Sequence, residues 1–523
     1  MKKFPSPFWY AVLFLGWLFD FLFWDHEPGV SFALYALATL SAGVILLRRE
    51  GAHPAKQTWL LFPFLLFFLA ITILRREPLT VFLAHVLTLL LMAILAVTYR
   101  GGKWLEYSFA DFFRQAFNLM IGILIRPVTA FSAARRAAQQ TERKPSTFWP
   151  IARGLLLALP IVVIFAALLA SADPLFARRL DAFVALLRLQ NLPEYLFRLF
   201  YILIIAYVLS GIYLYAFERS AEEPLLGREK PLIPPFLGFT EAAIVLGSVG
   251  LLFATFVVVQ FQYFFGGERN IHLEGYTYAE YARRGFGELV IVAFFSLLLF
   301  QVLSTITRRE RPQERRGFSV LGVVLVALVG VILLSAYQRL SLYEMAYGFT
   351  RLRTYTHVFM IWLAILLLAA AVLDLLHRQR AFAVICLFTL LGFGISLSLL
   401  NVDAFIVRQN VERFQKGEEL DLPYLTSLST DAIPALVAEY RSPTADQATR
   451  ERMAATLSCI LYEAQSRPSD PSWRAWNLSE ARAQALLRSV EPELRAYRVD
   501  DSDWPILVTS PQGNTFECFG RID

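Results

Sequence analysis

Five ionisable side chains stand within long apolar runs of the sequence, where an unpaired charge is costly. They are Asp20, His85, Arg198, Glu288 and His357. Because hydrocarbon does not solvate such groups, each is a candidate for binding a ligand or proton, or for an ion pair that joins two helices. For any one of them the structural pairing is the simpler interpretation. A single histidine on an apolar face is a weak indication of a metal site.

The densest polar pattern lies at residues 275–289, at the entry to one of these runs. Arg284 and Glu288 are spaced i, i+4 on one helical face, and nearby tyrosines are typical of the membrane interface. The pattern predicts a site for a headgroup, an anion or a proton, or alternatively a buried ion pair that locks the helix entry. The predicted binding residues are Tyr278, Tyr281, Arg283, Arg284, Glu288, Asp20 and His85.

The chain contains no motif of a known catalytic or cofactor site. It has no His-Glu-x-x-His, no glycine-rich phosphate loop and no nucleophile elbow, and none of its three cysteines forms a Cys-x-x-Cys pair. We therefore predict no catalytic residue, no metal and no cofactor. A composition that is 57% hydrophobic and 18% charged excludes disorder and, despite a pI near 9.1, argues against nucleic-acid binding. The predicted partner is the lipid bilayer.

About eleven runs are long and apolar enough to cross a membrane, which takes about 20 residues per helix. They cover residues 8–24, 30–47, 58–74, 79–99, 151–171, 195–217, 239–265, 285–306, 318–337, 355–376 and 381–400. The sequence therefore predicts an all-α polytopic membrane protein with its transmembrane domain at residues 1–400. The first run lacks a small-residue cleavage site, so we expect an uncleaved anchor.

The distribution of Lys and Arg predicts the orientation, because cytoplasmic loops carry the excess. With the N-terminus in the cytoplasm, the inner connections hold most of the basic residues, above all the arginines between Arg308 and Arg316. We interpret these as a topology anchor, with anionic lipid as an alternative partner. The five ionisable side chains then lie in the outer half, which suggests a polar cavity that opens outward. Glu241 and Asp374 lie near enough to the inner boundary to snorkel.

One amphipathic segment complicates this orientation. Between residues 104 and 138, large apolar residues recur at helical spacing, but Asp111, Arg114, Arg126 and Pro127 interrupt any clean span. We expect a helix lying in the inner interface. If the segment instead crossed the membrane, every later loop would change sides, and the arginines between Arg308 and Arg316 would face outward.

The composition of the chain changes at residue 401, where the long apolar runs end. Residues 401–523 have a soluble composition in which acidic side chains outnumber basic ones, and they predict a small, mainly helical, extracytoplasmic domain. Helical periodicity covers residues 431–440, 445–465 and 478–497, and residues 504–519 suggest short extended pieces. Cys459 and Cys518 both lie here, and outside the cytoplasm they are candidates for a disulfide or for two unpaired thiols.

Two polar features follow the last apolar run. The polar residues from Asn401 to Arg413 are expected to continue its helix into the outer interface. Asp431, three positions before Pro434, is interpreted as a helix N-cap with proline in the first turn.

Several of these stretches together resemble a known bacterial family. They are Tyr278-x-x-Tyr-x-Arg-Arg-Gly-Phe-x-Glu-Leu, Asn401-x-Asp-Ala-Phe-Ile, Asn410-Val-Glu-Arg-Phe, the stretch from Leu420 to Leu436, and Leu22-Phe-Trp-x-x-x-Pro-Gly-Val-Ser-Phe. The chain resembles multi-pass membrane proteins catalogued as a domain of unknown function (DUF 4173, related to DUF 4153). The resemblance implies an integral protein of the bacterial inner membrane and no particular reaction or ligand.

Two classes of function remain open from the sequence. The first is a non-enzymatic transporter, sensor or assembly factor with an outward-facing polar site, although no internal repeat supports transport. The second is an enzyme that acts on a lipid-linked substrate at the outer leaflet, similar in layout to polytopic glycosyltransferases. In that case Asp25 or Glu27 would be the base, and Arg283 and Arg284 would bind phosphate, but the first outer loop is short for such a site.

Overall fold

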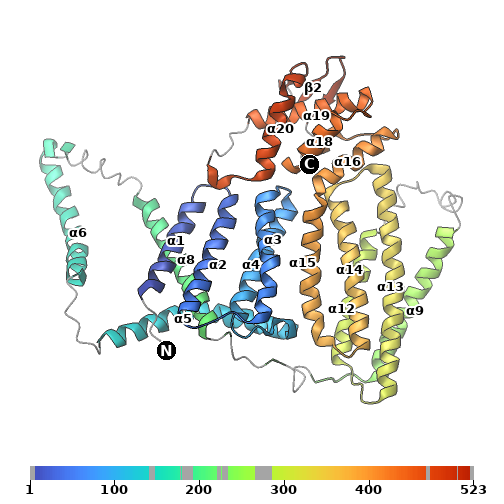
Figure 1. Ribbon diagram of the computed structural model, residues 1–523, viewed down its shortest axis with the longest axis horizontal. Coiled ribbons are helices and arrows are strands. Elements are labelled where there is room, and N and C mark those ends of the chain that lie inside the picture. Colours follow the sequence, from blue (N-terminus) through green and yellow to red (C-terminus); the bar gives the residue numbers. More distant parts are fainter. Residues whose placement is uncertain are drawn as a thin grey trace. The chain divides into compact units, whose positions relative to one another are not determined.

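The computed structural model describes residues 6–139, 148–176, 178–179, 192–218, 220, 225–226, 234–265, 286–466, 472–502 and 504–518. The chain divides into two compact units, each described here by itself. The first comprises residues 1–25, 35–53 and 116–220, and the second comprises residues 26–34, 54–115 and 221–523. Helices dominate both units, as the sequence predicts (Figure 1).

Two helix crossings in the first unit bring backbones into close contact. A β-carbon on Gly16 of α1 would lie 2.5 Å from the carbonyl oxygen of Ile202 on α8, and one on Gly211 of α8 would lie 2.6 Å from the Cα of Ile123 on α5. Glycine therefore permits both crossings. The helices of this unit are α1 (Ser6–Phe23), α5 (Phe109–Gln139) from residue 116 on, α6 (Phe148–Ala172), α8 (Leu192–Glu218) and the greater part of α2 (Val30–Arg49).

The second unit contains the remaining long helices. Helix α13 packs against α9, α12 and α14, and α15 joins α14 to the pair α3 and α4. Side chains such as Phe300, Phe318, Val329 and Leu363 form the apolar core among α9 and α12–α14. The bounds are α3 (Leu61–Leu74), α4 (Pro78–Thr98), α9 (Phe239–Phe265), α12 (Phe286–Ile306), α13 (Pro312–Tyr347), α14 (Arg351–Leu375) and α15 (Phe382–Leu400), with short helices η1 (Lys56–Leu60), η2 (Lys103–Glu106) and η4 (Gln379–Ala381).

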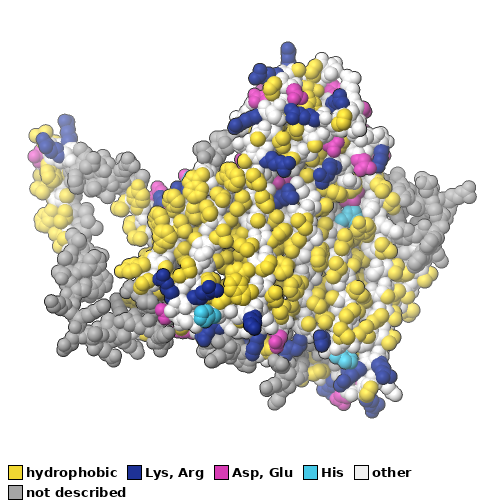
Figure 2. All heavy atoms as spheres, viewed as in Figure 1, with side chains coloured by type: hydrophobic (Ala, Val, Ile, Leu, Met, Phe, Trp, Pro, Cys, Tyr) yellow, Lys and Arg dark blue, Asp and Glu magenta, His cyan; other side chains and the backbone are white. Residues whose placement is uncertain are grey.

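Ten helices among the described residues are long and apolar enough to cross a membrane by length and composition, so the all-α polytopic fold is confirmed. Hydrophobic side chains cover the visible face over α3, α4, α14 and α15, as lipid contact requires (Figure 2). Nine of the ten helices match expected spans. The tenth is Phe109–Ala133, which the sequence placed at the interface. The first expected span forms a shorter apolar helix (Pro7–Phe23), and residues 151–171 lie within α6.

Helix α5 has its polar residues inside and its apolar residues outside. Asp111 and Gln115 are buried, whereas Phe113, Phe117 and Leu124 are each more than 60% exposed. Within the first unit, Figure 1 shows α5 at a steep angle to α1 and to α2. This direction suits a helix in the plane of an interface. Whether the segment spans the membrane or lies at its surface stays a prediction.

Residues 401–518 fold around their own core. Val407, Leu436, Leu457, Val490 and Val508 are buried there. The elements are α16 (Val402–Gln415), α17 (Leu422–Thr426), η5 (Thr430–Ala432), α18 (Ile433–Tyr440), α19 (Gln447–Ser466), η6 (Trp473–Ala475), α20 (Leu478–Leu494), and the strands β1 (Arg498–Asp500), β2 (Leu507–Thr509) and β3 (Thr515–Glu517). The strands form one antiparallel sheet in the order β1-β2-β3, which pairs Val499 with Val508 and Val508 with Phe516. We call this segment the tail.

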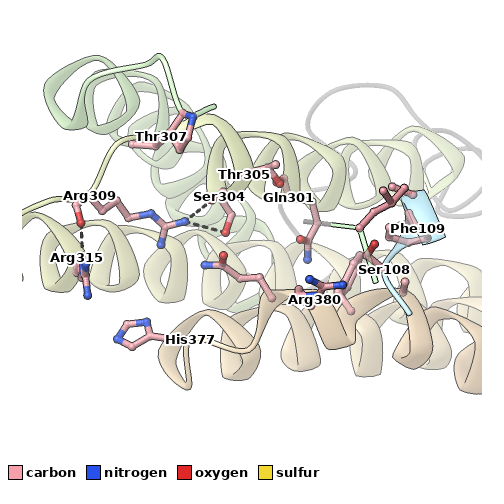
Figure 3. Close-up of a pocket in the computed structure, with 16 residues that line it drawn as sticks. Ser108, Phe109, Gln301, Ser304, Thr305, Thr307, Arg309, Arg315, His377 and Arg380 are labelled. Atoms are coloured by element: carbon pink, nitrogen blue, oxygen red, sulfur yellow. Dashed lines mark hydrogen bonds between the residues drawn. The ribbon is translucent and has the colours of Figure 1, made fainter. Parts of the chain in front are cut away.

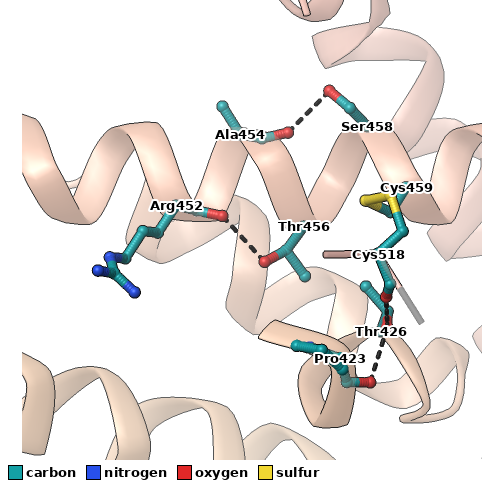
Figure 4. The surroundings of a disulfide bond; sticks show 8 residues. All are labelled: Pro423, Thr426, Arg452, Ala454, Thr456, Ser458, Cys459 and Cys518. Carbon is teal, nitrogen blue, oxygen red and sulfur yellow. Dashed lines mark hydrogen bonds between the residues drawn. A yellow bond between two sulfur atoms is a disulfide. The ribbon is translucent and has the colours of Figure 1, made fainter. Parts of the chain in front are cut away.

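A disulfide joins two distant parts of the tail. Cys459 on α19 and Cys518, just after β3, form the bond, with their Cα atoms 5.5 Å apart (Figure 4). Both residues are fully buried, and the Thr426 hydroxyl donates to the Cys518 carbonyl. The end of the chain is thereby held against α17 and α19. The third cysteine, Cys386, is unpaired.

The polar residues after α15 do not continue its helix, contrary to the sequence-based expectation. Asn401 adopts a left-handed conformation (φ 51°, ψ 73°) that ends α15 and starts α16 in a new direction. Asparagine tolerates this conformation better than most residues. The turn places α16 against the end of α14 rather than beyond α15.

Candidate functional site

Asp20 and Arg198 form an ion pair between α1 and α8, in which the carboxylate is buried. Nε and Nη2 of Arg198 donate to the two carboxylate oxygens at 3.0 and 2.6 Å, and Asp20 is 3% exposed. The guanidinium also lies 5.2 Å from the ring centre of Trp24, whose indole donates to Glu194 at 3.1 Å. A bidentate pair with an aromatic neighbour is a geometry that holds two helices together.

His85, another predicted binding residue, lies on α4 in the second unit. Its Nδ1 is 2.7 Å from the Val81 carbonyl, and its ring centre lies 4.2 Å from that of Phe32. Nε2 is buried with no hydrogen-bond partner among the described residues. Across those residues, no group of three His, Cys, Asp or Glu side chains could hold a metal ion.

The predicted site at residues 275–289 lies largely outside the described residues. Tyr278, Tyr281, Arg283 and Arg284 all belong to the part that is not described. Glu288 is in the first turn of α12 and is exposed. The predicted pair of Arg284 and Glu288 therefore stays a prediction.

The two carboxylates considered as alternative bases for an enzyme, Asp25 and Glu27, are both exposed. Asp25 is exposed in the first unit. Glu27, in the second unit, is 74% exposed on its side chain and lies 3.9 Å from Arg76. The phosphate-binding role assigned to Arg283 and Arg284 falls outside the described residues. The proximity of Asp25 or Glu27 to these arginines, which the enzyme hypothesis requires, therefore stays a prediction.

Charged side chains instead cluster where the tail meets the start of α4 and the start of α14. Arg351, at the start of α14, donates to both oxygens of Asp403 on α16 at 2.8 and 2.7 Å, and Asp403 is 0% exposed. The Ser429 N–H donates to the same carboxylate at 2.7 Å. The Arg351 N–H donates to the Tyr424 hydroxyl at 2.7 Å, and burial raises the pKa of Tyr424, so it stays protonated at neutral pH.

Asp431 connects the tail to α4 and is not the helix N-cap that the sequence suggested. Its Oδ2 accepts the backbone N–H groups of Arg76 and Glu77 at 2.7 and 2.8 Å, while α18 begins without a side-chain cap. Glu77 in turn caps α4 by accepting from Leu79 and Thr80, and it also accepts from the Tyr355 hydroxyl. The carboxylate is drawn away from its own helix because two other N–H groups of the loop before α4 would otherwise be unpaired.

We define the tail junction as Glu77, Arg351, Tyr355, Asp403 and Asp431. An apolar cluster that includes Leu397, Val402 and Ile406 lies beside it. Asn410 adds a reciprocal pair, accepting from the Phe349 N–H at 2.8 Å and donating to its carbonyl at 2.9 Å. Sequence reasoning singled out Asp403, Asn410 and Asp431, but it missed Glu77, Arg351 and Tyr355. The missed residues lie at the ends of apolar runs, where they look like ordinary boundary residues.

A second buried pair lies near the same end of α13 and α14. Nδ1 of His357 is 3.1 Å from Glu344, which is 2% exposed, and Tyr337 lies 4.4 Å away between ring centres. His357 therefore has a carboxylate partner from the neighbouring helix, as the pairing interpretation predicts. Nearby, the Gln260 side-chain oxygen accepts from Ser335 and Arg339.

At the opposite end of α14, Asp374 is buried rather than extended towards water. Arg309 and Gln379 donate to its Oδ1 at 2.7 and 2.8 Å, Ser319 donates to Oδ2 at 2.7 Å, and its exposed fraction is 2%. Snorkelling is the wrong description because these donors solvate the carboxylate inside the protein. Glu241 is exposed and accepts the Gly238 N–H at the start of α9.

Comparison with known proteins identifies a family. Residues 61–439 match the family described as "Domain of unknown function (DUF4153)". The matched region contains α3 to α18 and every residue of the tail junction, whereas the first-loop pattern at residues 22–32 precedes it. No curated protein matches the chain. No solved structure matches it either.

Proposed function

Since the chain belongs to the family described as a domain of unknown function (DUF4153), and its described residues include ten helices long and apolar enough to span a membrane, we propose its function from the tail junction. It is a non-enzymatic integral membrane protein of the assembly-factor type. In this proposal the membrane helices hold the tail in a fixed position at one membrane surface. The tail then presents a surface to other envelope components. The single observation that carries the proposal is the bidentate pair of Arg351 with Asp403 inside the junction.

The bonding within the junction supports a structural role over catalysis. Asp403 receives three donors, Asp431 receives two backbone N–H groups from the loop before α4, and Glu77 receives donors from α4 and Tyr355. A general base or a substrate ligand needs an oxygen within reach of substrate. These oxygens are buried and already bonded, so the groups act by holding two parts of the chain together.

We place the tail outside the cytoplasm and the protein in the bacterial inner membrane. Arg308, Arg309, Arg315 and Arg316 lie at the helix ends away from the tail, which agrees with a cytoplasmic location for those ends. The disulfide of the tail also suits an oxidising compartment. Labelling of a cysteine in the tail tests this location directly, and Thr444→Cys introduces one at an exposed position. A membrane-impermeant maleimide should label it in intact cells.

The functional experiment compares a deletion strain with strains that express variants of the full chain. Native gel profiles of envelope complexes are expected to lose one assembly in the deletion strain and to regain it with the wild-type chain. Arg351→Gln should fail to restore it. The matched control is Lys416→Gln, which breaks only the exposed pair with Glu412 on the same tail. Unchanged complexes together with altered ion or metabolite accumulation would instead support transport and overturn the proposal.

A further inference from the structure

A pocket with a cavity volume of about 700 Å³ lies at the ends of α12 and α14 away from the tail (Figure 3). Its walls come from the last turns of α12, the connection to α13 with its first turn, η4 with the start of α15, the start of α5, and Leu226 and Pro235. All of these residues belong to the second unit. The pocket therefore opens where several candidate spans end, at the level expected for lipid headgroups.

Three arginines line the pocket, and no carboxylate is among the 16 described residues that line it. Arg309 comes from the α12–α13 connection, Arg315 from the first turn of α13, and Arg380 from η4. Figure 3 shows Arg309 and Arg315 towards one side, with Arg380 nearer to Ser108 and Phe109. Among the described residues, the side chains that line the cavity therefore include guanidinium groups and no carboxylate, a combination that attracts anions.

The two aspartates that partner these arginines lie behind the lining. Asp374 holds Arg309 at 2.7 Å, and Asp111, which is 0% exposed, holds Arg380 at 3.1 Å. Each aspartate holds its arginine's guanidinium group in position without occupying the cavity. A ligand therefore meets a guanidinium group that is already oriented.

Two of the arginines keep unused donors. Nη1 of Arg380 is buried and has no hydrogen-bond partner among the described residues. Arg315 donates from Nε to the Arg309 carbonyl at 2.8 Å and pairs with no carboxylate in the described part of the chain. Guanidinium groups with free N–H donors match the oxygens of a phosphate group.

Part of the remaining lining is apolar. Phe109, Phe382, Ala383 and Pro235 form part of the wall, and Phe109 is 48% exposed. Ser304, Thr305, Gln301 and Gln379 add neutral hydrogen-bonding groups to the lining. A ligand that fills this space carries an anionic head and an apolar part.

We propose that this pocket binds a phosphate group, carried by an anionic phospholipid whose headgroup contacts Arg309, Arg315 and Arg380. The inference is independent of the proposed function, because it rests on the ends of α12 and α14 away from the tail junction. Free inorganic phosphate offers the same oxygens, so the experiment separates the two sources.

The test uses purified full-length protein in detergent and measures lipid binding by native mass spectrometry. Short-chain phosphatidylglycerol is titrated against phosphatidylcholine, and inorganic phosphate is added in a separate arm. Arg315→Gln removes a pocket arginine whose side chain, within the described part of the chain, donates to a single carbonyl. Arg316→Gln is the matched control, because Arg316 is the adjacent exposed arginine and does not line the pocket.

Phosphatidylglycerol should bind in preference to phosphatidylcholine, and Arg315→Gln should weaken it about fivefold, as expected for one basic residue near a membrane surface. Arg316→Gln should bind within about twofold of wild type. Displacement of the lipid by inorganic phosphate would support the phosphate site and show that the free ion is a second ligand. Equal binding of both lipids, or equal effects of the two substitutions, would overturn the proposal. Thermal unfolding of both variants confirms that they are folded.

Discussion

Gly29 lies against the backbone of Ala475, so closely that a β-carbon on Gly29 would fall 2.4 Å from both the carbonyl carbon and the carbonyl oxygen. The adjacent Val30 N–H donates to the Trp476 carbonyl at 2.9 Å. The loop before α2 thus contacts η6 of the tail directly. The pattern in the first loop includes this glycine, and the close approach of the tail leaves no room for a β-carbon at this position.

Gly29→Ala should therefore destabilise the protein. Since the neighbouring atoms are backbone, they cannot move aside as a side chain would, and overpacking of this kind costs about 1–3 kcal/mol. Thermal unfolding in detergent measures the loss. Gly250→Ala on α9 is the control, because a β-carbon there meets nothing within 4 Å. Equal melting temperatures for the two variants would contradict the close contact.

Arg351→Gln should be more damaging than the double variant with Asp403→Asn. The single change leaves the fully buried Asp403 without its cation, and removing one partner of a buried pair costs about 3–5 kcal/mol. The double variant removes the stranded charge as well, so it should recover part of the loss, with a coupling energy of about 0.5–3 kcal/mol. A double-mutant cycle on unfolding free energies gives this coupling. Additive effects would show that the pair is not coupled.

Loss of the tail disulfide should lower the stability of the tail. The bond closes a loop with a sequence separation of 59, for which the chain-entropy model gives about 4 kcal/mol. Cys518→Ser, or reduction, should lower the melting temperature, whereas Cys386→Ser should leave the disulfide intact. Intact mass spectrometry without reductant checks the bond itself. Finding three free thiols would argue against the bond and against an extracytoplasmic tail.

Glu439 should make the tail less stable at neutral pH than at acidic pH. Burial raises the pKa of Glu439, and the charge of Arg408 partly opposes this shift. The folded state therefore binds the proton more tightly than the unfolded chain, whose pKa is about 4.3. The contribution is present below that pKa and is lost as the pH rises through the folded pKa.

Glu439→Gln removes this titration. The variant should melt at a higher temperature than wild type at pH 7, and the difference should shrink as the pH falls below about 4. Melting curves at the two pH values provide the comparison. A constant difference at both pH values would mean that Glu439 does not titrate differently in the folded state.

The sequence by itself determined the elements of this protein. Runs of apolar residues predict the spans because a helix must be apolar along its whole length to cross a bilayer, and helical periodicity located α18, α19 and α20 closely. The sequence also showed which charged residues, such as Asp374, lie at the ends of these runs. These are local properties, and each can be read within a window of about 20 residues.

Only the tertiary structure decided what the polar residues do. Asp403 meets Arg351, Asp431 meets the loop before α4, and Gly29 meets Ala475, although each pair is far apart in the chain. An aspartate beside a helix start carries the same local signal whether it caps that helix or a distant one. The choice depends on which unpaired N–H groups or guanidinium groups the fold brings within about 3 Å, and this depends on packing across the whole unit.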